Sequence, residues 1–193
     1  MDKKVLDTLF LEARSHKFFR DRPISDDLLE KIYSMARMAP TAWNACPMRI
    51  AFVKSPEAKE KLLTALSPGN VDKTKSAPVT AIMAIDKDFP NKFDLLAPAM
   101  AGDTIFSKMS EKWFLQFIYR NANLQAGFFI LAARLCGLDC GPMSGFNNGQ
   151  VDKLFFEGTS WKSNFLINLG YGSGENLPQR APRLPFEDAC KIL

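Results

Sequence analysis

Basic and hydroxyl side chains gather near the N-terminus in a pattern that could hold a phosphate. Cations at four positions lie around Pro23 and accompany Ser15: Arg14, Lys17, Arg20 and Arg22. Guanidinium forks and hydroxyls bind phosphate oxygens through charge-assisted hydrogen bonds. The same residues could instead form a solvated surface cluster, and the residues alone leave both interpretations open. His16, in the middle of this segment, could equally lie on the surface.

Further segments carry groups suited to a flat, polar ligand. A turn bounded by prolines, PTAWNACP, spans 40–47, and an N-x-x-K pattern spans 70–73. A G-P-x-S-G pattern spans 141–145, where small residues allow the backbone to approach a flat ligand. Paired arginines follow in the C-terminal stretch, at Arg180 and Arg183. Each motif is weak when taken singly, and only their combination indicates a ligand site.

The glycine pattern at 170–174 does not predict a dinucleotide-binding loop. It reads G-Y-G-S-G after a strand-like run, which is not the G-x-G-x-x-G spacing. Pro178 also stands where the following helix should gain its first turns. The sequence contains no P-loop motif either, so phosphate binding has to come from the basic residues.

The four cysteines give little sign of catalysis or metal binding. None forms a C-x-x-C pair, and the chain has one histidine, so we do not expect a zinc site. Cys46 could act as a nucleophile with His16 as its base, but no third group is evident to orient the histidine. We therefore expect reduced thiols in a cytoplasmic protein.

Length and composition indicate a single domain spanning 1–193. The chain is 47% hydrophobic and 24% charged, which is ordinary for a globular protein that buries one core. A net charge of +4 without a long basic block suits a few phosphate contacts better than a nucleic-acid surface. The N-terminus has no apolar run long enough for a signal peptide. No apolar stretch reaches the length of a membrane span.

A helix centred on the run from Phe117 to Gly137 must position these groups. Its segment 126–133 (AGFFILAA) has no polar side chain, so protein should surround it. Glycine is the usual residue just past a helix end, which predicts a stop near Gly137. A Gly-Pro turn at 141–142 should then lead to the small residues of the candidate ligand loop.

The remaining pattern predicts an α+β fold in layers. Ser25 is a credible N-cap for its helix. Residues 5–13 carry the apolar face of a helix. The pattern at 88–110 indicates a loop with short helical pieces that could form a lid. Prolines keep the last stretch extended as an arm over a surface. The other expected elements are helices over 26–38, 56–66 and 150–156, strands over 49–54, 79–86 and 165–172, and a loop over 67–78.

In their order along the chain these motifs resemble the nitroreductase superfamily of FMN-dependent oxidoreductases, from about Leu9 to Leu193. The likeness rests on APT-x-x-N-x-x-P, the APVTAI strand, GLDxGPMSGF, the KSNxLINLGYG run and the tail around PRLxFEDAC. These motifs look most similar to the branch that contains malonic semialdehyde reductase. The resemblance implies a three-layer fold, with a central sheet flanked by helices, in an intertwined homodimer.

The resemblance also implies a cofactor site. An R-S-x-[RK] motif would bind the FMN phosphate, ribityl chain and pyrimidine edge, with His16 inside it. The turn at 40–44 would reach the flavin from the partner subunit, with Cys46 in place of a common Gln. The pair at 70 and 73 would face the pyrimidine, the loop at 142–145 would lie by the isoalloxazine, and the tail arginines would close on the phosphate. The expected cofactor-binding residues are Arg14, Ser15, His16, Lys17, Pro40, Thr41, Ala42, Asn44, Asn70, Lys73, Pro142, Met143, Ser144, Gly145, Arg180 and Arg183.

The implied activity is hydride transfer from NADH or NADPH to flavin N5 and then to an acceptor, with ping-pong kinetics and no side chain that must act as acid or base. The implied acceptor is a short 3-oxo acid such as malonic semialdehyde. A broad nitro or quinone reductase is the alternative among enzymes. A flavin-binding protein without physiological turnover is the alternative from another class. The active sites are expected at the interface of the homodimer.

Overall fold

The computed structural model describes residues 2–175 and 177–193, and a four-stranded antiparallel sheet lies at its centre. Along the sheet the strand order is β1-β2-β4-β3, so β1 and β3 are the edges. The strands are β1 (Met48–Val53), β2 (Val79–Asp86), β3 (Asp139–Met143) and β4 (Trp161–Gly170).

Strand β2 is covered on both faces, because all of its residues are buried. Its alternate side chains enter two separate cores, with Met83 in one and Ile82 in the other. A strand buried on both faces reads as a continuous apolar run, which is how VTAIMAID was recognised in the sequence. The predicted boundaries 79–86 are confirmed.

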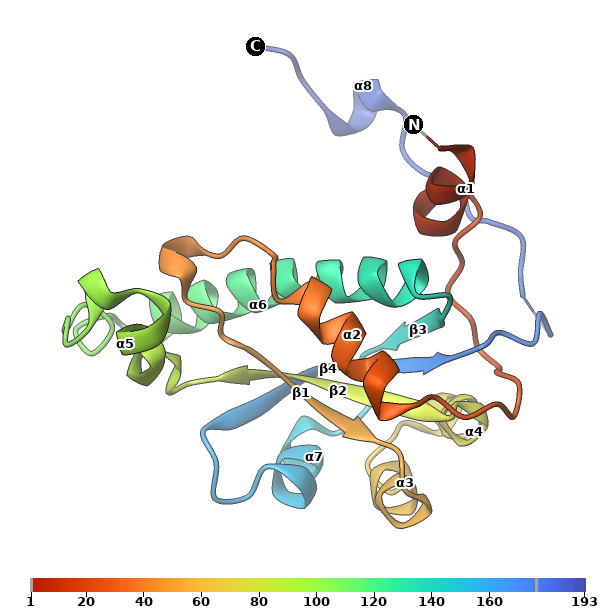
Figure 1. Cartoon of the computed structure of the whole chain (residues 1–193), viewed down its shortest axis with the longest axis horizontal. Helices are drawn as coiled ribbons and strands as arrows, with labels where there is room; N and C mark the ends of the chain where they lie inside the picture. Colours follow the sequence, from red (N-terminus) through yellow and green to blue (C-terminus); the bar gives the residue numbers. More distant parts are fainter. Residues whose placement is uncertain (1, 176) are drawn as a thin grey trace.

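Helices cover both faces of the sheet and form the two outer layers (Figure 1). One core packs against α2 (Asp26–Ala36) and α6 (Glu111–Leu135). The other packs against α3 (Pro56–Leu63) and α7 (Asn148–Phe155). The predicted three-layer α+β fold is confirmed, while the described part of the chain has no helix with the length and hydropathy of a membrane span.

Helix α6 is the longest helix and matches the predicted central helix, although it begins earlier, at Glu111. The hydroxyl of Ser110 accepts a hydrogen bond from the backbone of Trp113 and caps the start. Gly137, at φ 82°, follows the end as predicted. Full enclosure was expected, yet Leu124 remains 48% exposed. One face of α6 is therefore uncovered in the single chain.

Two local predictions are wrong. Residues 67–78 were expected to form a loop, but Pro68–Ser76 form helix α4. Pro68 lies in its first turn, where the missing N–H has no helical partner to lose. The expected turn at Gly141-Pro142 is part of β3, where Pro142 pairs with Ile167. An edge strand tolerates proline because one side of its backbone forms no ladder.

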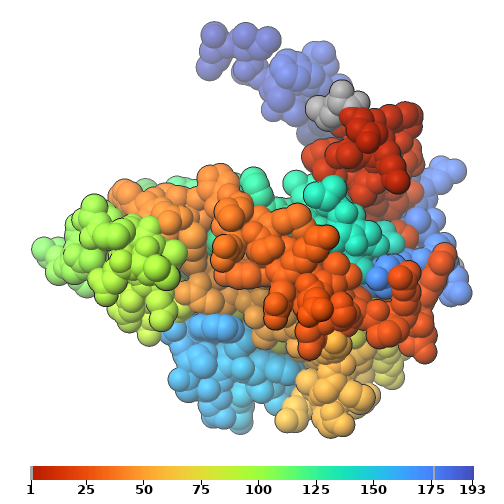
Figure 2. All heavy atoms as spheres, in the orientation of Figure 1, coloured from red at the N-terminus to blue at the C-terminus, as the bar shows by residue number. Residues whose placement is uncertain are grey.

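The end of the C-terminal arm stands off from the rest of the molecule, whereas the N-terminal segment lies against the end of α6 (Figure 2). The N-terminus forms α1 (Lys3–Leu6) and a π-helical turn, η1 (Asp7–Leu11). The C-terminal arm contains only the short α8 (Phe186–Ala189), and its residues from 178 onward are exposed. The arm was expected to lie over a surface, but most of it does not lie on its own chain. The loop at 88–110 has the expected short pieces, η3 (Phe89–Lys92), α5 (Phe93–Leu96) and η4 (Pro98–Met100).

Candidate functional site

A pocket of about 300 Å³, here called the arginine pocket, lies where the N-terminal segment meets the C-terminal arm. It brings together residues predicted for the phosphate from opposite ends of the sequence, and it adds Arg134 from α6. The lining residues are Phe10, Ala13, Arg14, Ser15, Arg134, Pro178, Gln179, Arg180, Ala181 and Arg183. Every charged side chain among them is a guanidinium, so the pocket suits an anion.

Reciprocal arginine contacts hold the arm against the N-terminal segment. The guanidinium of Arg14 donates to the carbonyl of Pro178 on the arm. In the opposite direction, Nη2 of Arg180 donates to the carbonyls of Leu11 at 2.6 Å and Ala13 at 2.7 Å. These contacts fix the position of the arm where it borders the arginine pocket.

The segment that carries Ser15 continues the sheet beyond edge strand β3. Ser15 pairs with Cys140 in a parallel bridge, and the backbone N–H of His16 donates to the carbonyl of Cys140 at 3.0 Å. The ring of His16 lies 3.3 Å from the carboxylate of Asp139, while Lys17 is exposed. His16 therefore anchors the segment, and its neighbours Arg14 and Ser15 line the pocket.

The predicted N-x-x-K pair lies against the predicted ligand loop. The side-chain amide of Asn70 donates to the carbonyl of Gly145 at 2.9 Å, and Nζ of Lys73 donates to Asn70 Oδ1 at 3.2 Å. A Cβ on Gly145 would lie 2.6 Å from the amide nitrogen of Asn70. The side-chain amide of Asn70 thus occupies the space beside Gly145, and helix α4 and the loop meet with Lys73 at their junction.

A second cavity of about 580 Å³, here called the neutral pocket, adjoins the same loop. All of its lining side chains are uncharged, and Asn164 donates to Asn123 across it at 2.7 Å. Three α6 residues contribute to it at helical spacing, and no motif in the sequence marks them as site residues. The lining residues are Asn123, Gly127, Ile130, Pro142, Met143, Ser144, Asn164 and Phe165.

The predicted turn at 40–44 does not join the other candidate residues within this chain. The backbone N–H of Ala42 donates to Asn121 Oδ1 at 2.8 Å, and Asn44 donates to the carbonyl of Leu96 at 2.7 Å. Asn121 and Arg134 lie about 20 Å apart along α6 at 1.5 Å per residue. In Figure 1 this turn lies toward one end of that helix, whereas the N-terminal segment and the C-terminal arm, which line the arginine pocket, lie toward the other end.

A buried ion pair holds the base of this turn. Arg49 Nη2 lies 2.6 Å from Asp86 Oδ2, and Arg49 Nη1 donates to the carbonyl of Cys46 at 2.9 Å. Ser160 donates to the other oxygen of Asp86 at 2.6 Å. The carboxylate thus fixes the guanidinium that supports the turn.

The cysteines show no nucleophile arrangement with the histidine. Cys46 donates to Asn44 Oδ1 at 3.3 Å, whereas His16 pairs with Asp139. Burial raises the pKa of Cys140 to about 12, so it remains a thiol at neutral pH. Among the residues that the structure describes, no three histidine, cysteine or acidic side chains form a group that could hold a metal.

Comparisons with known proteins agree with this fold. The sequence profile described as the nitroreductase family matches residues 11–171. A proposed NADH dehydrogenase/NAD(P)H nitroreductase from Stutzerimonas stutzeri strain A1501 is 50% identical over 192 residues, covering 100% of this chain and 97% of that protein. The chain belongs to the nitroreductase family.

Solved structures with low sequence identity share the fold. A proposed nitroreductase from Bacillus subtilis has a TM-score of 0.88 at 22% identity, with 100% of both chains covered. A proposed nitroreductase from Exiguobacterium sibiricum, solved in complex with FMN, has a TM-score of 0.86 at 18% identity, with 100% of this chain and 99% of that chain covered.

Proposed function

We propose that this chain is an FMN-dependent NAD(P)H oxidoreductase that acts as a single domain over 1–193. The observation that carries the proposal is the succession of the two pockets along α6. Asn123, Gly127 and Ile130 border the neutral pocket, and Arg134 borders the arginine pocket. A ligand with a neutral flat ring at one end and a phosphate at the other matches this order. Family membership and the FMN in the Exiguobacterium relative support the same cofactor.

The donor groups of the chain suit FMN. Arginine forks match a dianionic phosphate, and the neutral pocket beside Pro142, Met143 and Ser144 leaves room for a ring. When bound, FMN would supply two-electron hydride chemistry between NAD(P)H and an acceptor. The residues would bind and orient it, and the ammonium of Lys73 would stabilise negative charge on the pyrimidine side.

Lys73→Ala is expected to raise the Kd of FMN by about tenfold or more, because a hydrogen bond to a charged group is worth roughly 1.5–3 kcal/mol. Titration of the purified apoprotein by flavin fluorescence measures this change. Lys75→Ala is the matched control, since Lys75 is an exposed lysine on the same helix. Equal Kd values for the Lys73 variant and the wild type would remove Lys73 from the cofactor site.

The proposed assembly is an intertwined homodimer with active sites at the interface. Apolar side chains on α6 are exposed in the single chain, and the arm carries exposed Leu184 and Phe186. β1 is an edge strand with an unpaired side that an extended segment could join. The turn at 40–44 would then serve the flavin of the partner subunit. Light scattering should give twice the chain mass, and a monomer that binds FMN fully would contradict the dimer.

The acceptor has two candidates. The sequence motifs favour a short 3-oxo acid such as malonic semialdehyde, whose carboxylate would need a cation from the 88–112 region. The uncharged lining of the neutral pocket and the name of the Stutzerimonas relative favour nitro compounds or quinones.

We propose a cytoplasmic location in either case, in agreement with four free thiols.

An anaerobic spectrum with added FMN tests the function and the acceptor together. NADH or NADPH should bleach the visible flavin band. Recovery of the band with malonic semialdehyde would support the oxo-acid reaction, and alanine changes at lysines of 88–112 should then raise its KM selectively. Recovery only with quinones or nitroaromatics would support the alternative. A bound flavin that stays oxidised would indicate a protein without turnover, and no binding would refute the proposal.

A further inference from the structure

One stripe of helix α6 faces both pockets in succession. Asn123, Gly127 and Ile130 line the neutral pocket, and Arg134 lines the arginine pocket. Their spacing of four, three and four residues places them on a single face of an α-helix. Arg134 is therefore the point where this face reaches the anion-binding end of the site.

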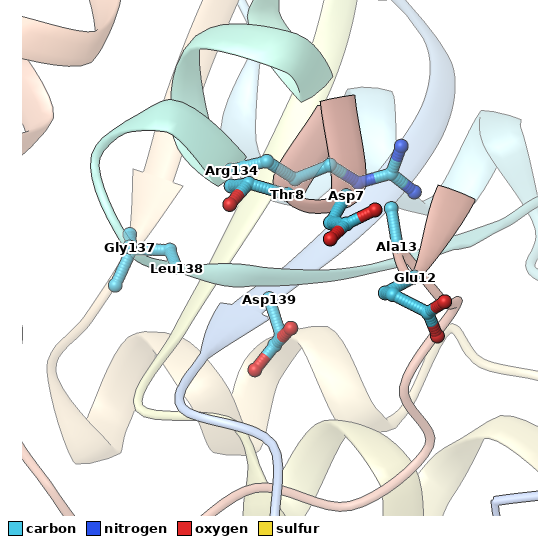
Figure 3. Close-up of a pocket in the computed structure, with 8 residues that line it drawn as sticks. All are labelled: Asp7, Thr8, Glu12, Ala13, Arg134, Gly137, Leu138 and Asp139. Atoms are coloured by element: carbon cyan, nitrogen blue, oxygen red, sulfur yellow. The ribbon is translucent and has the colours of Figure 1, made fainter. Parts of the chain in front are cut away.

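The side chain of Arg134 reaches from α6 to the N-terminal segment. Figure 3 shows its guanidinium beside Ala13, and both residues border the arginine pocket as well as the pocket drawn there. The short side chain of Ala13 leaves space for this approach. Arg134 is half-buried, and its Nη1 donates to the carbonyl of Leu9 at 3.1 Å. One of five N–H donors is used in this bond.

The other arginines of the pocket come from the N-terminal segment and the C-terminal arm. Arg180 directs one nitrogen to the carbonyls of Leu11 and Ala13, and Arg183 donates to the carbonyls of its own neighbours, Ala181 and Pro182. Arg134 instead projects from a 25-residue helix. A binding group on a regular helix is held more precisely than one on an extended arm. Ligand binding therefore costs less conformational entropy at Arg134 than at the arginines of the arm.

Acidic side chains also lie near Arg134. The pocket in Figure 3 is lined by Asp7, Glu12 and Asp139 in addition to Arg134. Within residues 2–175 and 177–193, no carboxylate forms an ion pair with Arg134 within 4 Å. The guanidinium thus stands between an acidic pocket and a basic one, and the basic side is where a bound anion would meet several arginines together.

From these observations we infer that Arg134 is a phosphate-binding residue of the cofactor site, acting with Arg14 and the arm. This inference rests on the proposed FMN function and extends it to a residue outside the N-terminal and C-terminal motifs. One helix would then contact the flavin ring through its middle and the phosphate through its last turn. The rigid helix would set the distance between the two ends of the ligand site.

The competing role for Arg134 is structural, because its bond to Leu9 could simply cap the N-terminal helical turn. FMN and riboflavin separate the two roles, since riboflavin is the same flavin without the phosphate. Arg134→Met is expected to raise the Kd of FMN by roughly 10- to 100-fold and to leave the Kd of riboflavin unchanged. Arg120→Met is the matched control, an exposed arginine of the same helix, and it should change neither constant.

Arg134→Lys covers the case in which the methionine variant does not fold. Lysine keeps the positive charge but lacks the forked guanidinium. This variant should therefore weaken FMN binding less than Arg134→Met does, and it should leave riboflavin binding unchanged. Equal weakening of both flavins would assign Arg134 a structural role and overturn the inference. Unchanged FMN binding in folded variants would overturn it as well. A wild-type protein that binds neither flavin would instead refute the proposed function.

Discussion

Asp86→Asn is expected to lower the free energy of unfolding by about 3–5 kcal/mol, because it leaves a buried guanidinium without its counter-charge. The Asp86 side chain is 6% exposed, and its oxygens meet Arg49 and Ser160, both at 2.6 Å. An amide keeps the shape but cannot balance the charge of Arg49. Urea unfolding followed by circular dichroism measures the loss.

The control for this variant is a second ion pair of equal length. Lys54 and Asp26 are also 2.6 Å apart, but their side chains are 41% and 80% exposed. Asp26→Asn should therefore cost only about 0–1 kcal/mol. Similar losses for the two variants would mean that burial does not set the strength of the Arg49–Asp86 pair.

Because Arg49 also holds the carbonyl of Cys46, the Asp86 variant should loosen the turn at 40–47.

Gly141→Ala is expected to impair stability and cofactor binding together. A Cβ at this position would lie 2.5 Å from the carbonyl oxygen of His16 and 3.5 Å from Cβ of Asn168. The first of these is a backbone atom, so the contact cannot be relieved by rotating a side chain. Overpacking a filled core costs about 1–3 kcal/mol, and we expect the upper part of that range.

The same contact should displace Ser15, which is bonded to the sheet at Cys140 and lines the arginine pocket. The Kd of FMN should therefore rise along with the loss of stability. Gly69→Ala is the control, because Gly69 lies in α4 with no atom within 4 Å of an added Cβ. Its alanine should be neutral or stabilising. A Gly141 variant with wild-type stability and FMN affinity would show that the segment at 15–19 can shift freely.

The sequence predicted the fold where a local pattern and the tertiary structure agree. Val79–Asp86 is a mostly apolar run and forms an inner strand of the sheet. Ser25 caps α2 by accepting a hydrogen bond from the backbone of Leu28 at 3.3 Å. Gly137 has the positive φ that favours glycine after a helix. In each case the physical cause lies in residues of the segment itself.

The errors arise where tertiary packing decides. Helix α4 has a polar sequence, and Thr74 is its buried residue, so it presents no apolar period. Strand β3 contains Gly141 and Pro142, which normally signal a turn, and only its place at a sheet edge makes them acceptable. Neither the packing of α4 nor the edge position of β3 can be derived from neighbouring residues in the sequence.

The candidate site could be predicted in its parts but not in its arrangement. The structure brings Asn70 and Lys73 to Gly145, and Arg14 to Arg180, while their roles toward a cofactor stay predictions. The positions of Arg134 and Asn123 beside the pockets were not predicted. In the sequence, a row of helix residues that faces a pocket has the same spacing as a row on any other face of the helix. The turn at 40–44 remains a prediction, since motif order does not tell which subunit a segment serves.

Helix α6 also limits how the chain can change in length. Its middle holds the turn at 40–47 and the start of β1 through Asn121 and Gln125, which accept from the backbone of Ala42 at 2.8 Å and Met48 at 3.0 Å. Its last turn carries Arg134. A single inserted residue between these points would rotate the last turn by about 100° and move it about 1.5 Å along the axis. Arg134 would leave its pocket, so we expect natural insertions and deletions to fall in the 88–110 loop and the arm instead.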